Sequence, residues 1–483
     1  MLVRNLKRNP QILKHCKAKM SFRLINIFFI VLIAYSVWAE EINNSRVHSS
    51  DTLESGTLLY ADNIRGLVRE ESLPSDIWRS MVDGLLYVPR QFVNGSIYVS
   101  GKTGAWVARD EVRERIENIL YLYKKNLGWH PVFYWTTGIR PKYGARVFFS
   151  RDDNTSSVMG VYHSETNWKI KGKASLAKVR KYWGWNVQLA GIADNSDDWE
   201  FYGFGSNPES DSRNTFKSGA SENYGNYAQL FRHTHLLAEV NPVQNWTISY
   251  LTYYHMRSLK QTGFQEPLLQ DILAVNELYT FKRKRPVEQY YQELSLALDT
   301  RENKNQLYSG VRTEGYVGVS RGIGGDESRF YRSGLDISLF IPVRRSRRHE
   351  RIFLVRSVYD GLFNKRDDVP VPFTEYPQHL TFRGTPGRAF IRVDNRSLVN
   401  TLEYQWAGGP FLNTHVFVDH LIVGEKLGTF KWNEGLYAAG IGVDFHYRAK
   451  ELVRVQLSMG NVGLRLAANV GVPLKRNYRG DWE

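Results

Sequence analysis

Apolar and polar residues alternate with a period of two along much of the chain after about residue 131. Three clear examples place apolar side chains at Leu294, Leu296 and Leu298, at Leu335, Ile337, Leu339 and Ile341, and at Val453, Val455, Leu457 and Met459. This period predicts β-strands with one apolar face and one more polar face. A soluble sandwich turns such an apolar face inward and a membrane barrel turns it outward, so the alternation alone leaves both folds open.

The spacing of the alternating segments favours a barrel. Three or four strands are expected within 131–178, and the others near residues 184–195, 226–239, 244–257, 286–300, 306–319, 328–343, 350–361, 397–408, 411–423, 435–447, 452–460 and 463–474. The connections alternate between short turns, such as 240–243 and 408–410, and long loops, such as 196–222 and 362–396. Outer-membrane barrels have short turns at one end and long loops at the other. The predicted fold is therefore all-β, a transmembrane antiparallel β-barrel of about sixteen strands.

The first 39 residues have the layout of an export signal. Seven basic residues precede an apolar stretch from Leu24 to Tyr35, and Val37-Trp38-Ala39 provides a cleavage site. The apolar stretch is too short to span a bilayer comfortably, although an N-terminal anchor helix is the alternative. Met20 is an alternative start of the chain. The sequence thus predicts a signal peptide over residues 1–39.

Residues 40–130 are expected to form a small N-terminal segment that lies in the periplasm or plugs the barrel. Its first part, residues 40–75, is polar and irregular, whereas Ala105 to Lys125 has the period of an amphipathic helix. The barrel is expected over 131–475, and a polar tail over 476–483.

Charge and cysteine content exclude several function classes. Removal of the seven basic residues of the signal lowers the net charge from +15 to +8, and the only cysteine, Cys16, leaves with them. The mature chain then has no disulfide and no thiol chemistry. Its remaining charge is modest and spread out, so we expect no nucleic-acid partner. His233 and His235 share a strand face but lack an evident third ligand, so we expect no metal or other cofactor.

An Arg- and Gly-rich motif lies in the long connection before the last five predicted strands. The chain reads Phe382-Arg-Gly-Thr-Pro-Gly-Arg-Ala-Phe-Ile-Arg-Val-Asp394 there, and Leu398-Val-Asn-Thr-Leu-Glu-Tyr404 follows. This order resembles the barrel of the BamA/TamA and two-partner-secretion transporter superfamily, also called the bacterial surface antigen family. That family carries a Val/Leu-Arg-Gly-Phe/Tyr motif on a long loop that folds back into the lumen.

Three further segments extend the resemblance to about residues 130–475. Phe417-Val-Asp-His-Leu421 is similar to the family's Phe-x-Asp-x-Gly strand except at the glycine. Phe201 to Asn207 is similar to its Tyr-Gly-x-Gly-Asn loop, and Ala468 to Leu474 to its closing strand. The chain departs from the family at Phe382 and Thr385, and at Leu474 in place of a terminal aromatic residue. The family's usual string of N-terminal repeat domains is expected to be absent or reduced to one divergent unit.

The resemblance implies that Arg383 and Gly384 enter the lumen. An arginine fork pairs well with carboxylates, and two candidates follow on neighbouring predicted strands. Glu403 and Asp419 have the parity opposite to their apolar neighbours, so both can face inward. Our hypothesis is a latch in which Glu403 and Asp419 hold Arg383 and thereby fix the long loop inside the barrel. The alternative is that Arg383 is a solvated loop residue.

The resemblance also implies a non-enzymatic role at the bacterial cell outer membrane. The expected function is assembly, insertion or translocation of proteins or lipids, with membrane lipids and unfolded outer-membrane or secreted proteins as partners. Clients would add a strand at a weak seam between segments near 131–151 and 463–474. A passive pore or structural surface antigen is the alternative. Gly318-Val-Ser-Arg-Gly322 matches a hydrolase motif, but no helix is expected after Ser320, so we expect no enzyme.

Overall fold

The computed structural model of the protein describes the strand-rich part of the chain. The residues described are 121–123, 126–136, 139–151, 154–179, 183–215, 224–260, 268–269, 286–301, 309–325, 327–344, 351–365, 369–379, 381–384, 389–390, 392–409, 412–447, 450–461 and 463–470. The signal peptide expected over 1–39, nearly all of the segment expected over 40–130 and the tail expected over 476–483 lie outside these residues.

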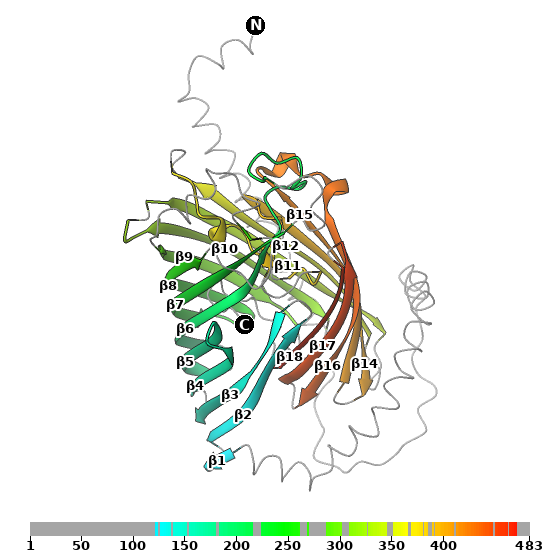
Figure 1. Cartoon of the computed structure of the whole chain (residues 1–483). Coiled ribbons are helices and arrows are strands. Elements are labelled where there is room, and N and C mark those ends of the chain that lie inside the picture. Colours follow the sequence, from blue (N-terminus) through cyan, green and yellow to red (C-terminus); the bar gives the residue numbers. More distant parts are fainter. Residues whose placement is uncertain are drawn as a thin grey trace. The chain divides into compact units, whose positions relative to one another are not determined.

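Almost every regular element in this part of the chain is a β-strand (Figure 1). The strands are β1 (Tyr121–Tyr123), β2 (Leu127–Thr136), β3 (Ile139–Arg151), β4 (Asn154–Ser164), β5 (Asn167–Val179), β6 (Gly184–Phe201), β7 (Gly225–Asn241), β8 (Trp246–Lys260), β9 (Val287–Asp299), β10 (Gly310–Gly322), β11 (Arg329–Arg344), β12 (Arg351–Asn364), β13 (Ala389–Phe390), β14 (Arg396–Gly409), β15 (Leu412–Gly424), β16 (Leu436–Tyr447), β17 (Lys450–Gly460) and β18 (Gly463–Val470). Three short 3-10 helices accompany them, η3 (Phe373–Glu375), η4 (Leu427–Thr429) and η5 (Trp432–Glu434). Among the described residues, no helix is both long enough and apolar enough to cross a membrane.

Sixteen of these strands form one antiparallel sheet in sequence order, from β2 to β12 and from β14 to β18. The predicted sheet of about sixteen strands is therefore confirmed, and the sandwich alternative is wrong. Among the described residues, its first and last strands, β2 and β18, pair at two positions, Ala467 with Thr136 and Ala468 with Trp135. By contrast, β17 and β18 are in register over eight pairs. The sheet thus curls round without a continuous ladder at its ends.

The alternation in the sequence sets which side chains face outward. On β9, Leu294 is 54% exposed while Glu293 is only 3% exposed, and on β17, Met459 is 69% exposed while Ser458 is 4% exposed. Successive side chains of a strand point to opposite faces, so one face of the sheet is apolar and the other polar. The apolar face is the outer one, which reverses the arrangement expected of a soluble domain.

The long loops lie at one end of the strands. Because neighbouring strands are antiparallel, the connections β6–β7, β8–β9, β12–β14 and β15–β16 all leave the sheet at the same end. The connections β7–β8, β14–β15 and β16–β17 at the opposite end are short turns. We call these the long-loop end and the short-turn end. This layout is the one that the spacing of the sequence predicted.

The start of the sheet differs from the prediction. The amphipathic helix expected from Ala105 to Lys125 is wrong at its C-terminal end, because Tyr121–Tyr123 is strand β1 and pairs with the start of β2. The sheet proper begins at Leu127 rather than at residue 131. Over so short a stretch, Tyr-Leu-Tyr satisfies both a helical and a strand pattern, and pairing with the edge of β2 decides for the strand.

Candidate functional site: the connection between β12 and β14

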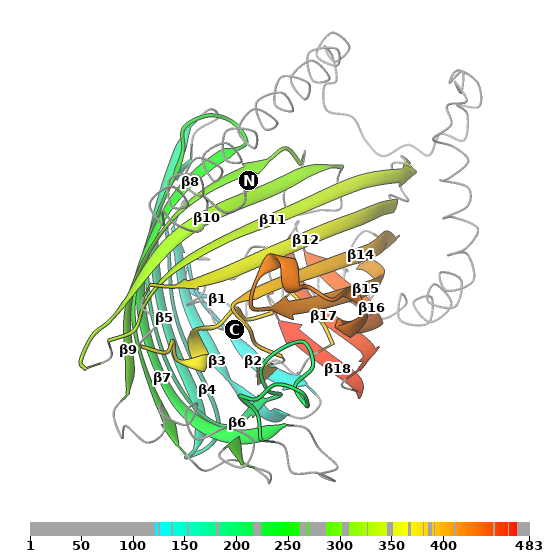
Figure 2. The ribbon, with the colours of Figure 1, turned by 90° about the horizontal axis from the view of Figure 1, so that it is seen from above.

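The connection between β12 and β14 crosses to the far part of the sheet and returns. It leaves β12 after Asn364, and its strand β13 pairs in parallel with the end of β6, six strands away. An isolated bridge from Phe204 to Val393 continues this pairing. Figure 2 shows the connection running inside the curve of the sheet.

A buried aromatic cluster packs the connection against β6 and β7. Phe373 of η3 lies 5.0 Å from Phe201 and 5.7 Å from Tyr227, measured between ring centroids. Trp199, Phe204, Leu269 and Val393 complete the cluster. Edge-to-face aromatic pairs of this kind add about 0.5–1.5 kcal/mol each to the effect of area burial. The connection is therefore held by apolar packing at its distant point as well as by strand pairing.

Arg383 lies between Glu403 and Asp419, the two carboxylates that the sequence predicted as its partners. Its Nε donates to Asp419 Oδ2 at 2.8 Å, and its Nη2 donates to Asp419 Oδ1 at 2.7 Å. Nη1 donates to Glu403 Oε2, and the backbone N–H of Arg383 donates to Asp419 Oδ2 at 3.0 Å. The structure thus brings Arg383, Glu403 and Asp419 together, with the fork bidentate to Asp419.

Further contacts surround the ion pair. The guanidinium carbon of Arg383 lies 3.4 Å from the ring centroid of Phe417, which adds a cation–π contact. Thr401 Oγ1 donates to Asp419 Oδ1 at 2.8 Å, and Ser458 Oγ donates to the carbonyl oxygen of Arg383 at 2.8 Å. Asp419 is fully buried. A buried carboxylate needs such a set of donors, because burying it unpaired costs several kcal/mol.

Gly384 is required by the close approach of the connection to the sheet. A Cβ at this position would lie 2.7 Å from the ring of Phe382 and 2.8 Å from Ala438 Cβ. Phe382 is itself buried in a cluster with Leu421 and Leu436. The flanking Phe382, which departs from the family motif, is therefore a packing residue of the sheet's inner face.

We expect Gly384→Ala to lower the free energy of unfolding by about 1–3 kcal/mol, because the added methyl group overpacks the buried Phe382 and Ala438. The measurement is the urea unfolding midpoint of the protein in detergent micelles, followed by tryptophan fluorescence. Gly428→Ala is the matched control, since a Cβ there meets nothing within 4 Å. Equal midpoints for the two variants would contradict the close approach.

Glu375 makes a second polar anchor of the connection, on β8. Its Oε1 lies 3.0 Å from His255 Nε2 and 3.4 Å from Arg257 Nε, and Arg332 Nη1 donates to its carbonyl oxygen at 3.4 Å. Burial alone would raise the pKa of Glu375, but the charges of His255, Arg257 and Arg332 outweigh it and lower the pKa to about 2. The sequence did not single out any of these residues.

This pKa predicts an acid-dependent contribution to stability. The carboxyl of Glu375 has an ordinary pKa of 4.5 and a folded pKa of about 2, so its contribution is fully present above 4.5 and is lost as the pH falls toward 2. We expect Glu375→Gln to be destabilised by on the order of 3 kcal/mol at pH 7 and to converge with the wild type near pH 2. Urea unfolding at several pH values measures the gap; a gap independent of pH would contradict the assignment.

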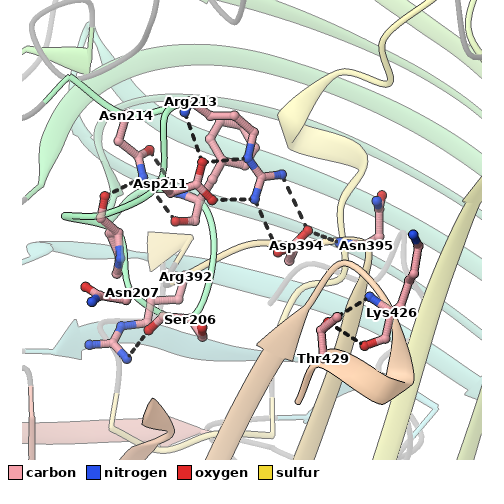
Figure 3. A network of polar contacts seen from close by, with 12 residues as sticks. Ser206, Asn207, Asp211, Arg213, Asn214, Arg392, Asp394, Asn395, Lys426 and Thr429 are labelled. Atoms are coloured by element: carbon pink, nitrogen blue, oxygen red, sulfur yellow. Dashed lines mark hydrogen bonds and ion pairs between the residues drawn. The ribbon is translucent and has the colours of Figure 1, made fainter. Parts of the chain in front are cut away.

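A third set of contacts ties three connections together at the long-loop end (Figure 3). Arg213 of the β6–β7 connection bridges Asp211, at 2.6 Å, and Asp394 of the β12–β14 connection, at 3.2 Å. Arg392 Nη1 donates to the carbonyl oxygens of Ser206, at 2.8 Å, and of Glu434, at 2.7 Å, in the β15–β16 connection. The partners that join different connections lie far apart in the sequence, so no local pattern indicates them.

The segment from Phe201 to Asn207 contributes to this tie. Its Gly203 and Gly205 have backbone φ values of 92° and 80°, which residues other than glycine rarely adopt. Ser206 Oγ also donates to Glu434 Oε2 at 2.6 Å. The glycines that carry the family resemblance here thus have a backbone role, in the turn that brings Ser206 to the other two connections.

Two other candidate sites from the sequence, the Ser320 motif and the His233/His235 pair, lie within strands of the sheet. Ser320 lies within β10 and donates to Gln289 Oε1 at 2.8 Å, so it sits on no strand-to-helix turn. His233 Nε2 and His235 Nδ1 are 3.0 Å apart on β7, with both side chains buried. Within the described part of the chain, no three His, Cys, Asp or Glu side chains gather as a metal site.

Comparison with solved structures gives many likenesses, among them those to BamA, CdiB and OccK11. No protein-family model matches the chain, and no curated protein matches it. BamA from Haemophilus ducreyi lacking POTRA domains 1-3 is 11% identical with a TM-score of 0.45, over 71% of this chain and 69% of that one. CdiB from Acinetobacter baumannii is 10% identical with a TM-score of 0.41, over 71% of this chain and 59% of that one. Pseudomonas aeruginosa OccK11 (OpdR) is 10% identical with a TM-score of 0.29, over 72% of this chain and 94% of that one.

The motifs of this sequence resemble those of the superfamily that includes BamA. Because all three TM-scores are below 0.5, we draw no conclusion about activity from these likenesses. The pairing, burial and contacts of the chain itself carry the functional proposal.

Proposed function

We propose that the chain is a bacterial outer-membrane barrel that inserts, assembles or translocates proteins at the seam between β2 and β18. The observation that carries the proposal is the short pairing of these two strands within the part of the chain that the structure describes, two residue pairs against eight between β17 and β18. Exposed strand edges readily add another strand, so a weakly paired seam offers a site for an unfolded client. Strand addition of this kind needs no catalytic group.

The outer surface supports membrane placement. Large apolar side chains are exposed on nearly every strand, among them Val158, Ile170, Leu294, Val317, Leu402, Met459 and Leu464. So wide an apolar surface would drive aggregation of a soluble monomer. Aromatic pairs near the long-loop end, Tyr254 with Tyr290 and Tyr331 with Phe363, match the aromatic girdle of outer-membrane barrels. Membrane lipids are thus the proposed surroundings.

The edge of β2 shows how little of the seam is paired. On the edge away from β3, the described strand pairing of β2 consists of β1 at Leu127 and Gly128 and β18 at Trp135 and Thr136. The pairing of β1 there is itself an example of a short segment added to this edge. The seam predicted near 131–151 and 463–474 corresponds to β2 and β18, with β3 inside the sheet.

The passive-pore alternative makes a different demand on the lumen. A pore needs an open path, whereas the β12–β14 connection is anchored to β14 and β15 through Arg383, to β8 through Glu375 and to β6 through β13. We therefore favour the client-handling role. Low single-channel conductance of the protein in planar bilayers supports this choice, and a large steady conductance supports the pore.

A disulfide across the seam tests the proposed function. We expect oxidised Trp135→Cys/Ala468→Cys to lose client assembly in cells depleted of the wild type, and reductant to restore it. The matched control is Gln456→Cys/Ala467→Cys, which links the fully paired β17 and β18. The chain's only cysteine, Cys16, lies in the predicted signal peptide, so after its removal no native thiol competes with the introduced pair. Full activity of the cross-linked seam variant contradicts strand addition at this seam.

A further inference from the structure

We propose that the outer face of β10, β11 and β12 carries, at its long-loop end, a binding site for anionic lipid headgroups that end in a phosphate monoester. The site consists of Arg321, Arg329 and Lys365, with Arg396 of β14 at its flank. The inference rests on the proposed membrane placement and assigns a specific lipid chemistry to one part of the barrel rim.

The three cations end three neighbouring outward columns of apolar side chains. In each strand, an exposed apolar or aromatic residue is followed, two positions nearer the long-loop end, by a cation: Val319 by Arg321, Tyr331 by Arg329, and Phe363 by Lys365. Residues two apart on a strand share a face, so Arg321 and Arg329 point outward with their apolar partners. The intervening Ser320 and Phe330 are buried on the other face.

Arg321 and Arg329 stand directly opposite each other. They are partners in the β10–β11 register and both are exposed. Like charges directly opposite on neighbouring strands destabilise a sheet. Within the described residues, neither guanidinium has a carboxylate within 4.0 Å. Two glutamates lie in the same region of the sheet: Glu327 is in the turn between β10 and β11, and Glu288 accepts a hydrogen bond from Tyr254 at 3.0 Å. An anion bound between the two arginines would offset their repulsion.

Aromatic rings orient the other two cations. Lys365 Nζ lies 5.5 Å from the ring centroid of Tyr331, and the guanidinium carbon of Arg396 lies 3.7 Å from that of Phe363. Cations stacked on aromatic rings keep their charge at the level of the ring. Tyr331 and Phe363 face each other across β11 and β12, so both cations lie over one aromatic pair.

The position of the site selects a lipid as its occupant. The cations lie where the apolar columns stop at the long-loop end, and the aromatic rings there mark the boundary between acyl chains and headgroups. A phosphorylated lipid places its chains against Val317 and Val319 and its phosphate at Arg321 and Arg329. Each basic residue near an anionic surface adds to the attraction of anionic lipid, so three together give clear selectivity.

The test compares lipid retention by charge-neutralised variants. Purified full-length protein is mixed with equal amounts of phosphatidic acid and phosphatidylcholine, and bound lipids are counted by native mass spectrometry. We expect the wild type to retain phosphatidic acid about tenfold over phosphatidylcholine, and Arg321→Gln/Arg329→Gln/Lys365→Gln to fall below about twofold. The matched control is Lys178→Gln/Lys426→Gln/Lys431→Gln, three exposed lysines elsewhere, and it should keep the preference.

Two results would overturn the site: no preference in the wild type, or equal loss of preference in both triple variants. Binding of a soluble acidic peptide in place of the lipid would assign the rim to a protein partner and also contradict the proposal. Insertion into phosphatidylcholine vesicles is measured on the same samples. Inserted protein without lipid preference refutes this inference alone, whereas failure to insert refutes the membrane placement beneath it.

Discussion

Arg383→Ala should lower the free energy of unfolding by about 3–5 kcal/mol, the usual cost of breaking a buried ion pair. The variant leaves Glu403 and Asp419 buried without their shared cation, and Asp419 is fully enclosed. It also removes the stack on Phe417. The measurement is urea unfolding of the protein in lipid vesicles, followed by tryptophan fluorescence. If Arg383 acts as a latch, the β12–β14 connection also becomes more accessible to protease in this variant.

Two variants separate the latch from a general loss of charge. Arg383→Lys keeps the charge but loses the bidentate fork, so we expect an intermediate loss of stability. Lys431→Ala removes an exposed cation whose pairing with Glu434 is worth little, so its stability should stay within about 0.5 kcal/mol of the wild type. A change below about 1 kcal/mol for Arg383→Ala would mean that Arg383 is a solvated loop residue.

Leu294→Arg should destabilise the inserted barrel by about 2–4 kcal/mol, because a charge on the lipid face near mid-membrane is costly. Leu294 is 54% exposed on the outer face of β9, where its register partners are Tyr250 and Val317. In water the same substitution at a half-exposed site would be nearly neutral. Urea unfolding from vesicles therefore measures whether this face meets lipid.

Val243→Arg provides the comparison for Leu294→Arg. Val243 has the same 54% exposure but lies in the β7–β8 turn at the short-turn end. Outside the bilayer core, its substitution should change stability by less than about 0.5 kcal/mol. Equal effects at Leu294 and Val243 would contradict a lipid-facing β9.

The sheet was predictable because its side chains alternate on a long, simple pattern. Strand positions from residue 184 onward follow from that period and from the turn residues between them. The inward parity of Glu403 and Asp419 follows from the same alternation, and the family motif supplies Arg383 as their partner. The structure brings these three residues together, and both carboxylates face inward as the alternation predicted.

The remaining anchors of the β12–β14 connection were beyond sequence reasoning. Glu375 meets His255 across 120 positions, and Arg213 meets Asp394 across 181. Glu375, Arg213 and Asp394 lie in connections without a regular period, where only the folded path decides the partner. Strand β1 was missed for a related reason, since three residues are too few for a period to distinguish a strand from a helix.

The most direct test of the central claim is cell fractionation combined with gel mobility of unheated and heated samples. An outer-membrane barrel predicts that the protein fractionates with the outer membrane and migrates differently before and after heating, because a folded barrel resists detergent unfolding at room temperature. A soluble periplasmic protein with one mobility in both samples would contradict membrane insertion, and the proposed function and lipid site would fall with it.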